Sequence, residues 1–371
     1  MARPLLFLLR LLLLLPALLA MPGMAQEPVP EPVRIGVLAY RGTEQALRTW
    51  QGHADYLAQK IPGQHFVVVP LSYPALTEAV SQHRIELLIT NTGHYTELEA
   101  SGDVSRIATR LIAGPDGPLN RFGGTAITLP ERTDIQHYSD LKGKRLLIPD
   151  KSSLGGWQVH LREALSQQTD LEEEVSRLVE TENHEKVVEG VLAGEADAGF
   201  IRSDLIESMI ANGRLKPGAL KIIDTRQTAG YPFLHSTRLY PEWPLARVGS
   251  FPEEISKEIL VALLAMTPDD AAARSAHIHG WTLPQNYQSV LDLFREARLG
   301  PYAHQQVTWG DIMARYGAVI LLSGGGLLLA ALLAGCDMLG IDSPEKIAAV
   351  REAEGKAIGG ACRHAARAIE D

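Results

Sequence analysis

The chain has 371 residues and a net charge of −9, and 46% of its residues are hydrophobic, which is enough for one large domain or two medium ones. This apolar content and the scattered charges exclude a disordered chain, and the lack of a basic block argues against a nucleic-acid-binding surface. A small anion stays a candidate ligand, because a pocket depends on local donors rather than on total charge.

Residues 1–25 have the pattern of a secretory signal peptide. Arg3 supplies the positive start, Leu11–Ala20 is the apolar run, and Gly23 and Ala25 are the small residues at the expected cleavage site. The alternative is an uncleaved membrane anchor. In both cases the sequence predicts that the rest of the chain is exported.

From residue 33 onward, short apolar runs alternate with segments of helical spacing, which predicts a parallel sheet flanked by helices. The expected strands of this first set are Val33–Ala39, Phe66–Pro70, Glu86–Thr90 and Ile107–Ala113. The expected helices are Glu44–Ile61 and Pro74–His83.

A second set begins after the Gly/Pro-rich stretch Gly114–Pro118. Its expected strands are Gly124–Leu129, Arg145–Pro149, Glu174–Val179, Ala196–Ile201 and Lys221–Thr225. Its expected helices are Gly155–Gln167, His184–Ala193 and Ser203–Asn212. Residues 232–301 are expected to be mostly helical, most clearly over Pro252–Met266 and Asn286–Arg298.

The second set is nested inside the first, which predicts an α/β domain over residues 33–302 with two lobes and a cleft between them. The first lobe is expected to comprise about 33–115 and 230–302, and the second about 119–226. In open α/β sheets, ligands bind beyond the carboxyl ends of the strands, so functional residues are expected just after each strand.

Tyr316–Gly335 is a run of 20 uncharged residues bounded by Arg315 and Asp337, which predicts a transmembrane helix. A buried helix is the alternative. Together with the signal peptide, this helix predicts an inner-membrane protein whose binding domain lies in the periplasm and whose short tail, 336–371, lies in the cytoplasm.

Polar residues cluster at the ends of four of the expected strands, in segments 39–42, 90–95, 151–157 and 194–202. The third segment carries Ser152, Ser153, Gly155 and Gly156 at an expected helix start, where hydroxyls, amides and the helix dipole can hold an anion. The alternative is that one of the two serines only caps the helix.

The other candidates also have structural alternatives. Asn91 can be an ordinary cap, Tyr40 and Tyr95 can be core aromatics, and Asp197 can be a solvated loop residue. His94 and His184 are each expected to be structural hydrogen-bonding residues rather than ligand contacts.

Catalytic chemistry is not predicted. The sequence has no nucleophile elbow, no paired catalytic carboxylates and no metal-ligand spacing, so we expect neither an enzyme nor a cofactor or metal. Its two cysteines, Cys336 and Cys362, lie outside the main body, which must therefore be stable without a disulfide.

The chain resembles the PhnD-like family of phosphate/phosphonate-type periplasmic binding domains, in order, over roughly residues 33–302. The segments that carry the resemblance are Arg34–Gly42, Thr90–Tyr95, Asp140–Lys144, Leu154–Trp157, Gly194–Arg202, Ser236–Pro244, Gly280-Trp281 and Gly300–Tyr302. The resemblance implies a two-lobed, type II periplasmic-binding-protein fold. The cleft residues it implies are Tyr40, Tyr95, Ser152, Ser153 and those around Asp197, with Asn91 and Arg202 added.

Within this family the chain is most similar to the sensory domains of tetrathionate-sensor-like histidine kinases, which carry a membrane helix directly after the binding domain. This implies a membrane-tethered sensor of phosphate, a phosphonate or a sulfur oxyanion. A kinase core is not expected in the 35 residues after Cys336, so the interpretation is a truncated or kinase-less relative with a histidine kinase as partner. The substrate-binding component of an ABC transporter, with a permease as partner, is the alternative, and a homodimer is left open.

Overall fold

The computed structural model describes residues 31–303, together with a few helical residues between 313 and 356. The predicted signal peptide lies outside the described residues, as do most of the predicted transmembrane helix and of the tail. Within the described part of the chain, none of the helices combines the length and the apolar character that a membrane span needs.

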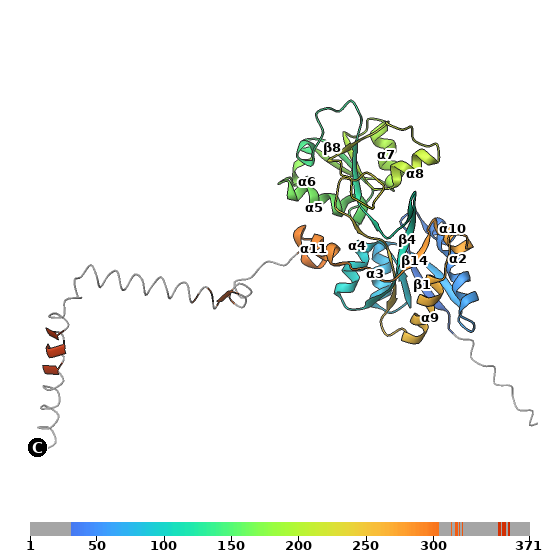
Figure 1. Cartoon of the computed structure of the whole chain (residues 1–371), viewed down its shortest axis with the longest axis horizontal. Helices are drawn as coiled ribbons and strands as arrows, with labels where there is room; N and C mark the ends of the chain where they lie inside the picture. The colour runs from blue at the N-terminus through green and yellow to red at the C-terminus, as the bar shows by residue number, and fades with distance from the viewer. Residues whose placement is uncertain are drawn as a thin grey trace, which may run out of the picture. The chain divides into compact units, whose positions relative to one another are not determined.

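Lobe 1 is built on a sheet with the strand order β14-β4-β13-β3-β1-β2, to which β5 is added by pairing with β4 (Figure 1). The strands are β1 (Val33–Leu38), β2 (Phe66–Leu71), β3 (Leu87–Ile89), β4 (Val104–Gly114), β5 (Gly117–Leu119), β13 (Pro244–Val248) and β14 (Gly280–Thr282). β1 lies in the sheet interior and pairs in parallel with β2 and β3, which explains its almost continuous apolar sequence.

Helices cover both faces of this sheet. They are α2 (Thr43–Lys60), α3 (Tyr73–Ser81), α4 (Thr92–Ala100), α9 (Glu253–Leu264) and α10 (Ala271–Ala276). One buried cluster joins the sheet to α2, α9 and α10 around Trp50 and Trp281, and a second joins it to α3 and α4 around Leu76 and Tyr95. Successive strand residues point to opposite faces, so Leu87 belongs to the first cluster and Leu88 to the second.

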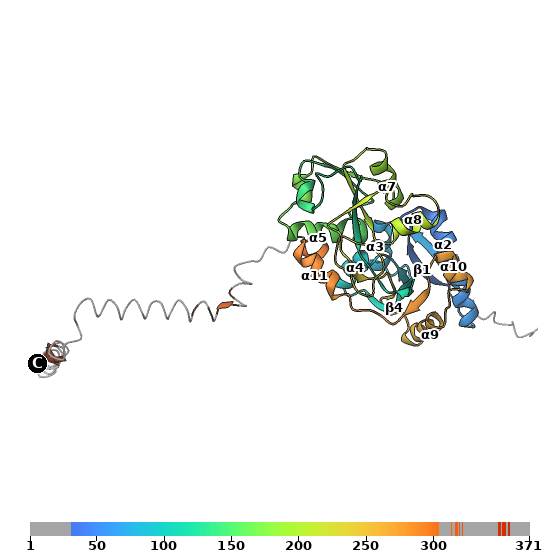
Figure 2. The same ribbon diagram turned by 45° about the horizontal axis from the view of Figure 1, so that its top comes forward.

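Lobe 2 has a sheet with the order β11-β7-β10-β8-β9. The part of the ribbon that forms this lobe carries the labels α5, α7 and α8 in Figure 2. The strands are β7 (Gly124–Thr128), β8 (Arg145–Ile148), β9 (Arg177–Glu180), β10 (Ala198–Arg202) and β11 (Lys221–Ile223). Around them lie the short η1 (Tyr138–Leu141), the π-helical turn η2 (Leu154–Gln158), α5 (Val159–Ser166), α6 (Leu171–Glu174), α7 (His184–Leu192) and α8 (Leu205–Ala211). This lobe also has a buried cluster on each face of its sheet.

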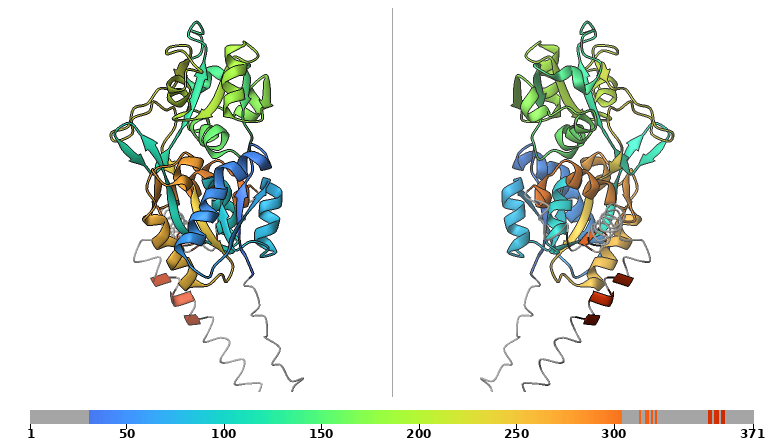
Figure 3. Two further views of the ribbon diagram at one scale, coloured as in Figure 1. Left: turned by 90° about the vertical axis from the view of Figure 1, so that its right-hand side faces the viewer. Right: turned by 90° about the vertical axis from the view of Figure 1, so that its left-hand side faces the viewer.

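The chain crosses between the lobes through a two-stranded antiparallel ribbon, β6 (Arg121–Phe122) with β12 (Tyr240–Pro241). Figure 3 shows lobe 2 above lobe 1. The last helix, α11 (Gln288–Glu296), is followed by η3 (Gly300–Tyr302). A separate buried cluster joins η2 and α5, the ribbon and α11: Phe122, Leu154, Val159, Tyr240, Val290, Leu293 and Phe294. Lobe 2, the crossover and α11 therefore share one apolar core.

The predicted α/β class with two lobes is confirmed, but parts of the prediction are wrong. The expected strand Glu174–Val179 is instead the end of α6 followed by β9. The sheets are mixed rather than parallel, because β13 runs antiparallel to β3 and β4, and β7 runs antiparallel to β10 and β11. The region 232–301 also holds β12, β13 and β14 beside its helices. Strands of two to five residues are too short for their periodicity to separate them from a buried helical segment.

Candidate functional site

The N-termini of two helical segments, one from each lobe, meet where the lobes touch. Asn91 caps α4 of lobe 1, its Oδ1 accepting the N–H of His94 at 3.0 Å. The Nδ2 of the same side chain donates to the carbonyl of Ser152 in lobe 2 at 3.3 Å and to the hydroxyl of Tyr73. Asn91 is only 4% exposed, so this cap also fixes the start of α4 beside the loop that leads into η2.

Both of these helix starts have N–H groups without an acceptor among the described residues. In α4 they belong to Thr92 and Gly93, and in η2 to Leu154 and Gly155. The first N–H groups of a helix carry its partial positive charge, so two such ends close together favour an anion between them.

The two serines before η2 have different roles. The Oγ of Ser153 accepts the N–H of Gly156 at 3.1 Å and is the N-cap, as the structural alternative predicted, while its O–H is left to donate. The backbone N–H of Ser152 donates to Asp150 at 2.6 Å, and its hydroxyl has no partner among the described residues. Ser152 is therefore the freer of the two for a ligand.

Close packing requires both glycines of η2. A Cβ on Gly155 would lie 2.9 Å from the side chains of Phe122 and Arg202. A Cβ on Gly156 would lie 2.2 Å from Pro149 and 2.9 Å from the ring of His184. The glycines thus let η2 approach the end of β10 and the start of α7.

Arg202, at the carboxyl end of β10, belongs to a buried chain of charges. Its guanidinium donates to Asp204 at 2.7 Å and to Glu242 at 2.5 Å, and Arg110 donates to the other oxygen of Glu242 at 2.7 Å. Glu242 is fully buried; burial alone would raise the pKa of this carboxyl, but Arg110 and Arg202 hold it at about 2. The chain of charges runs from β4 of lobe 1 through the crossover to β10 of lobe 2, so Arg202 has a structural role at the edge of the cleft.

His184 is the first residue of α7 and lies beside Arg202. Its Nδ1 accepts the backbone N–H of Arg202 at 3.2 Å, which assigns the ring proton to Nε2. Burial, with Arg202 and Arg41 nearby, lowers the pKa of His184 to about 3, so the ring is neutral at ordinary pH. Among the described residues Nε2 has no partner, which leaves it as a neutral donor at the same lobe contact.

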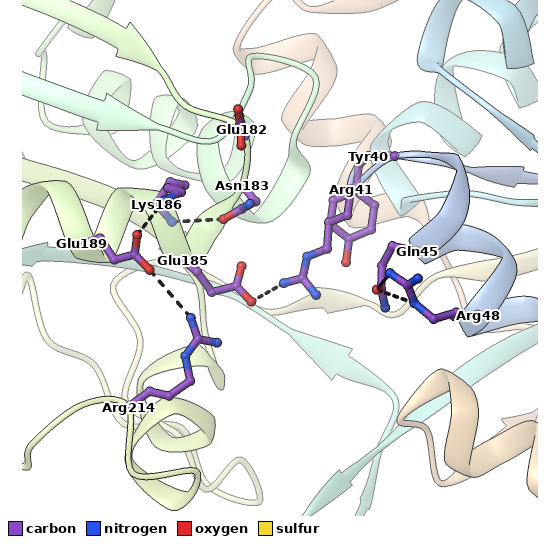
Figure 4. Close-up of a pocket in the computed structure, with 11 residues that line it drawn as sticks. Tyr40, Arg41, Gln45, Arg48, Glu182, Asn183, Glu185, Lys186, Glu189 and Arg214 are labelled. Atoms are coloured by element: carbon purple, nitrogen blue, oxygen red, sulfur yellow. Dashed lines mark hydrogen bonds and ion pairs between the residues drawn. The ribbon is translucent and has the colours of Figure 1, made fainter.

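Next to this contact lies a cavity of about 690 Å³ lined by both lobes (Figure 4). Arg41 of lobe 1 reaches across it to an ion pair with Glu185 of α7. Tyr40 is 43% exposed at the wall and meets Trp243 edge-on, with ring centroids 5.8 Å apart. Further charges of both signs line it: Arg48, Glu182, Lys186, Glu189 and Arg214.

The structure places two predicted cleft residues elsewhere. Tyr95 is fully buried in lobe 1, where its hydroxyl donates to Glu99 at 2.8 Å and its ring meets Tyr287. It follows Asn91 by one helical turn and faces the sheet rather than the helix end. Asp197 precedes β10, at the opposite end of that strand from Arg202, and is held by Arg132 and Arg145. The structure groups Tyr40, Asn91, Ser152, Ser153, Gly155, Gly156 and Arg202 at the lobe contact or the adjoining cavity.

Glu242 and Glu185 were not singled out from the sequence, although the first lies in the quoted segment Ser236–Pro244 and the second follows an expected helix start. The sequence did offer one indication for Glu242, which is a charged residue placed between Pro241 and Trp243. His94 does have the structural role expected for it, because Thr90 and Thr77 each share a hydrogen bond with one of its ring nitrogens at 2.9 and 2.8 Å. No group of three potential metal ligands occurs among the described residues.

Comparison with known proteins agrees with this architecture. The tetrathionate sensor histidine kinase TtrS of Salmonella typhimurium is 27% identical over 300 residues, which are 81% of this chain. They are 49% of TtrS, so the chain spans about half the length of this curated relative.

Two solved structures share the type II periplasmic-binding-protein fold. The binding protein component of an ABC phosphonate transporter from Pseudomonas aeruginosa has a TM-score of 0.59 at 13% identity, covering 82% of this chain and 99% of its own. PhnD1 from Prochlorococcus marinus, in complex with methylphosphonate, has a TM-score of 0.58 at 12% identity, covering 72% and 98%. A family model also matches residues 35–288. By this match the chain belongs to the family of periplasmic substrate-binding proteins of phosphonate ABC transporters.

Proposed function

We propose that the domain binds a small oxyanion between its lobes: phosphate, a phosphonate or a sulfur oxyanion. The observation that carries the proposal is the meeting of two helix N-termini. Four of their N–H groups, those of Thr92, Gly93, Leu154 and Gly155, have no acceptor among the described residues. An anion there would accept these donors and offset the like partial charges of the two helix ends.

Side chains around the contact would complete the site. The hydroxyls of Ser152 and Ser153 and the Nε2 proton of His184 are neutral donors, and Tyr40 and Arg41 stand at the cavity wall. Asn91 would hold the two lobes in register through Ser152. The classes of ligand follow from the relatives, since PhnD1 was solved with methylphosphonate and TtrS is a tetrathionate sensor.

We further propose that the domain is a membrane-tethered sensor with α11 as its output. Arg162 of α5 makes a bidentate ion pair with Glu296 of α11, both distances being 2.7 Å. Leu293 and Phe294 pack in the same cluster as Leu154 of η2. A shift of η2 on ligand binding would therefore move α11, which leads toward the segment 316–335 that we propose to span the inner membrane.

A screen of the full chain tests the binding proposal. Phosphate, methylphosphonate, sulfate and tetrathionate are added in turn and the melting temperature is measured; a ligand at 100 times its Kd stabilises by about 2.7 kcal/mol. We expect at least one oxyanion to raise the melting temperature, and Ser152→Ala to reduce that rise. If none of the four changes the melting temperature, the proposal fails.

The alternative role is the substrate-binding component of an ABC importer, which the matching family favours. Deleting 316–335 separates the two roles, since an importer component should still support uptake while a tethered sensor should lose its response. Glu296→Gln gives a finer test: the sensor proposal expects unchanged ligand affinity with a weaker response, and Asp292→Asn on the same helix is the control.

A further inference from the structure

Gln158 is a buried amide where the lobes touch, and its oxygen lacks a partner. It is the last residue of η2 and is 4% exposed, and its Oε1 accepts no hydrogen bond from the described residues. A Cβ placed on Gly93 of lobe 1 would lie only 2.5 Å from this oxygen. The amide is thus enclosed at the contact between the lobes, with its oxygen unpaired among the described residues.

The enclosure leaves no space for a ligand at that atom. The atom is buried, and α4 and η2 are in close contact beside it, since a Cβ on Gly93 would also lie 3.3 Å from the Cβ of Leu154. A hydrated amide on an open cleft would have lost its water when the lobes met, and a buried acceptor without a partner carries a desolvation cost.

A second atom repeats the pattern. The Oε2 of Glu185 is buried and unpaired among the described residues, although its Oε1 pairs with Arg41 across the cavity. Three such side-chain atoms are found in the described part of the chain, and the third, His53 Nδ1, lies in the core of lobe 1. Both of the oxygens lie at contacts between the lobes.

We propose that Gln158 limits ligand affinity by opposing lobe closure. Its amide is hydrated when the lobes are apart and loses that hydration when η2 meets α4. The free protein is thereby biased toward the open state, and part of the ligand's binding energy offsets this cost. The inference rests on the proposed oxyanion binding, and it adds that a residue without ligand contact sets the affinity.

Substitutions of Gln158 distinguish two roles. If the amide opposes lobe closure, removing it raises the ligand affinity, and if the amide contacts the ligand, removing it lowers the affinity. Gln158→Met keeps the length of the side chain and removes the polar end, so we expect calorimetric titration of the full chain with methylphosphonate or phosphate to show about fivefold tighter binding or more. Gln158→Glu should weaken binding, because closure would bury an unpaired charge. Gln51→Met, at an exposed position of α2, is the control and should change nothing. Weaker binding by Gln158→Met would mean that the amide contacts the ligand, and would overturn the inference.

A measurement without ligand keeps this test separate from the proposed function. The N–H groups of Thr92, Gly93, Leu154 and Gly155 have no acceptors among the described residues, so their hydrogen exchange reports whether the lobes shield them from water. In the ligand-free full chain, Gln158→Met should slow exchange in the peptides that contain them, relative to the natural chain and to Gln51→Met. Unchanged or faster exchange refutes the inference, whereas failure of every oxyanion to bind refutes only the proposed function.

Discussion

The two ends of strand β10 carry the same kinds of charged residue in opposite settings. At its start, Asp197 pairs with Arg132 and Arg145, whose side chains are 25% and 45% exposed. At its end, Arg202 joins Glu242, which is fully buried, and through it Arg110 of the other lobe. The first network stays within lobe 2, while the second connects both lobes through the crossover.

The difference shows that ion pairs must be judged by their surroundings. Exposed pairs gain little because water screens them, whereas removing one member of a buried set leaves a charge without compensation. The pKa of both carboxyls is held at about 2, so pKa alone does not separate the structural end of the strand from the cleft end.

The largest expected effect comes from Glu242→Gln, which leaves Arg110 and Arg202 buried with less counter-charge. We expect a loss of about 3–5 kcal/mol in the free energy of unfolding, measured by urea denaturation. A loss no greater than that of Asp197→Asn would contradict the distinction between the two ends.

Mild acid, between about pH 7 and pH 5, should destabilise the protein through its buried histidines. Asp197 and Glu242 do not contribute in this range, since their pKa of about 2 keeps both carboxylates ionised. Burial lowers the pKa of His53, His160 and His184 to about 3 and that of His94 to about 4. Below about pH 6.5 these histidines are protonated in the unfolded chain but stay neutral in the folded chain, so the free energy of unfolding decreases as the pH falls. Burial raises the pKa of Glu97 to about 7, which works in the opposite direction.

We therefore expect a net loss of about 5 kcal/mol between about pH 7 and pH 5, from four histidines at about 1.4 kcal/mol per pH unit each below about pH 6.5, less the contribution of Glu97. Urea denaturation at the two pH values measures this loss. Equal stability at both would mean that these histidines are accessible to protons in the folded state.

The two serines before η2, at the cleft end of β10, are expected to affect different properties, Ser153 the stability of the fold and Ser152 the binding of the oxyanion. Ser153→Ala removes the cap on Gly156 and should cost about 1 kcal/mol of stability, measured by thermal denaturation. Ser152→Ala should leave the melting temperature of the ligand-free protein unchanged and weaken oxyanion binding. The reverse assignment of the two effects would show that Ser152 is the cap in solution.

Asp197→Asn should have the smallest effect. We expect a loss of no more than about 1 kcal/mol, because its partners are partly exposed, and no change in the affinity for any oxyanion. Calorimetric titration checks the affinity, and weaker binding by this variant would indicate that Asp197 contacts the ligand.

Most of the larger elements were predictable from local patterns. Phe66–Pro70 and His184–Ala193 were expected to within one residue of β2 and α7, because long apolar runs and capping residues mark such elements. The helix start at Ser152–Gly156 was predicted from residue type, while anion binding there stays a prediction. Tyr95 was assigned to the cleft through a resemblance of segments, which does not say on which side of a helix a side chain lies. Asp197 was assigned in the same way, although the expected strand Ala196–Ile201 already placed it near the start of that strand.

By itself, the sequence determined an α/β domain with two lobes and a helix start rich in hydroxyls and glycines, because hydrophobic periodicity and capping chemistry are local properties of the chain. Only the tertiary structure decided that this helix start meets the N-terminus of α4, that Glu242 joins arginines from both lobes, and that the Gln158 oxygen is enclosed without a partner among the described residues. These features depend on burial between segments that are far apart in the chain. The free energy of a polar group depends on its burial, which its residue type does not determine.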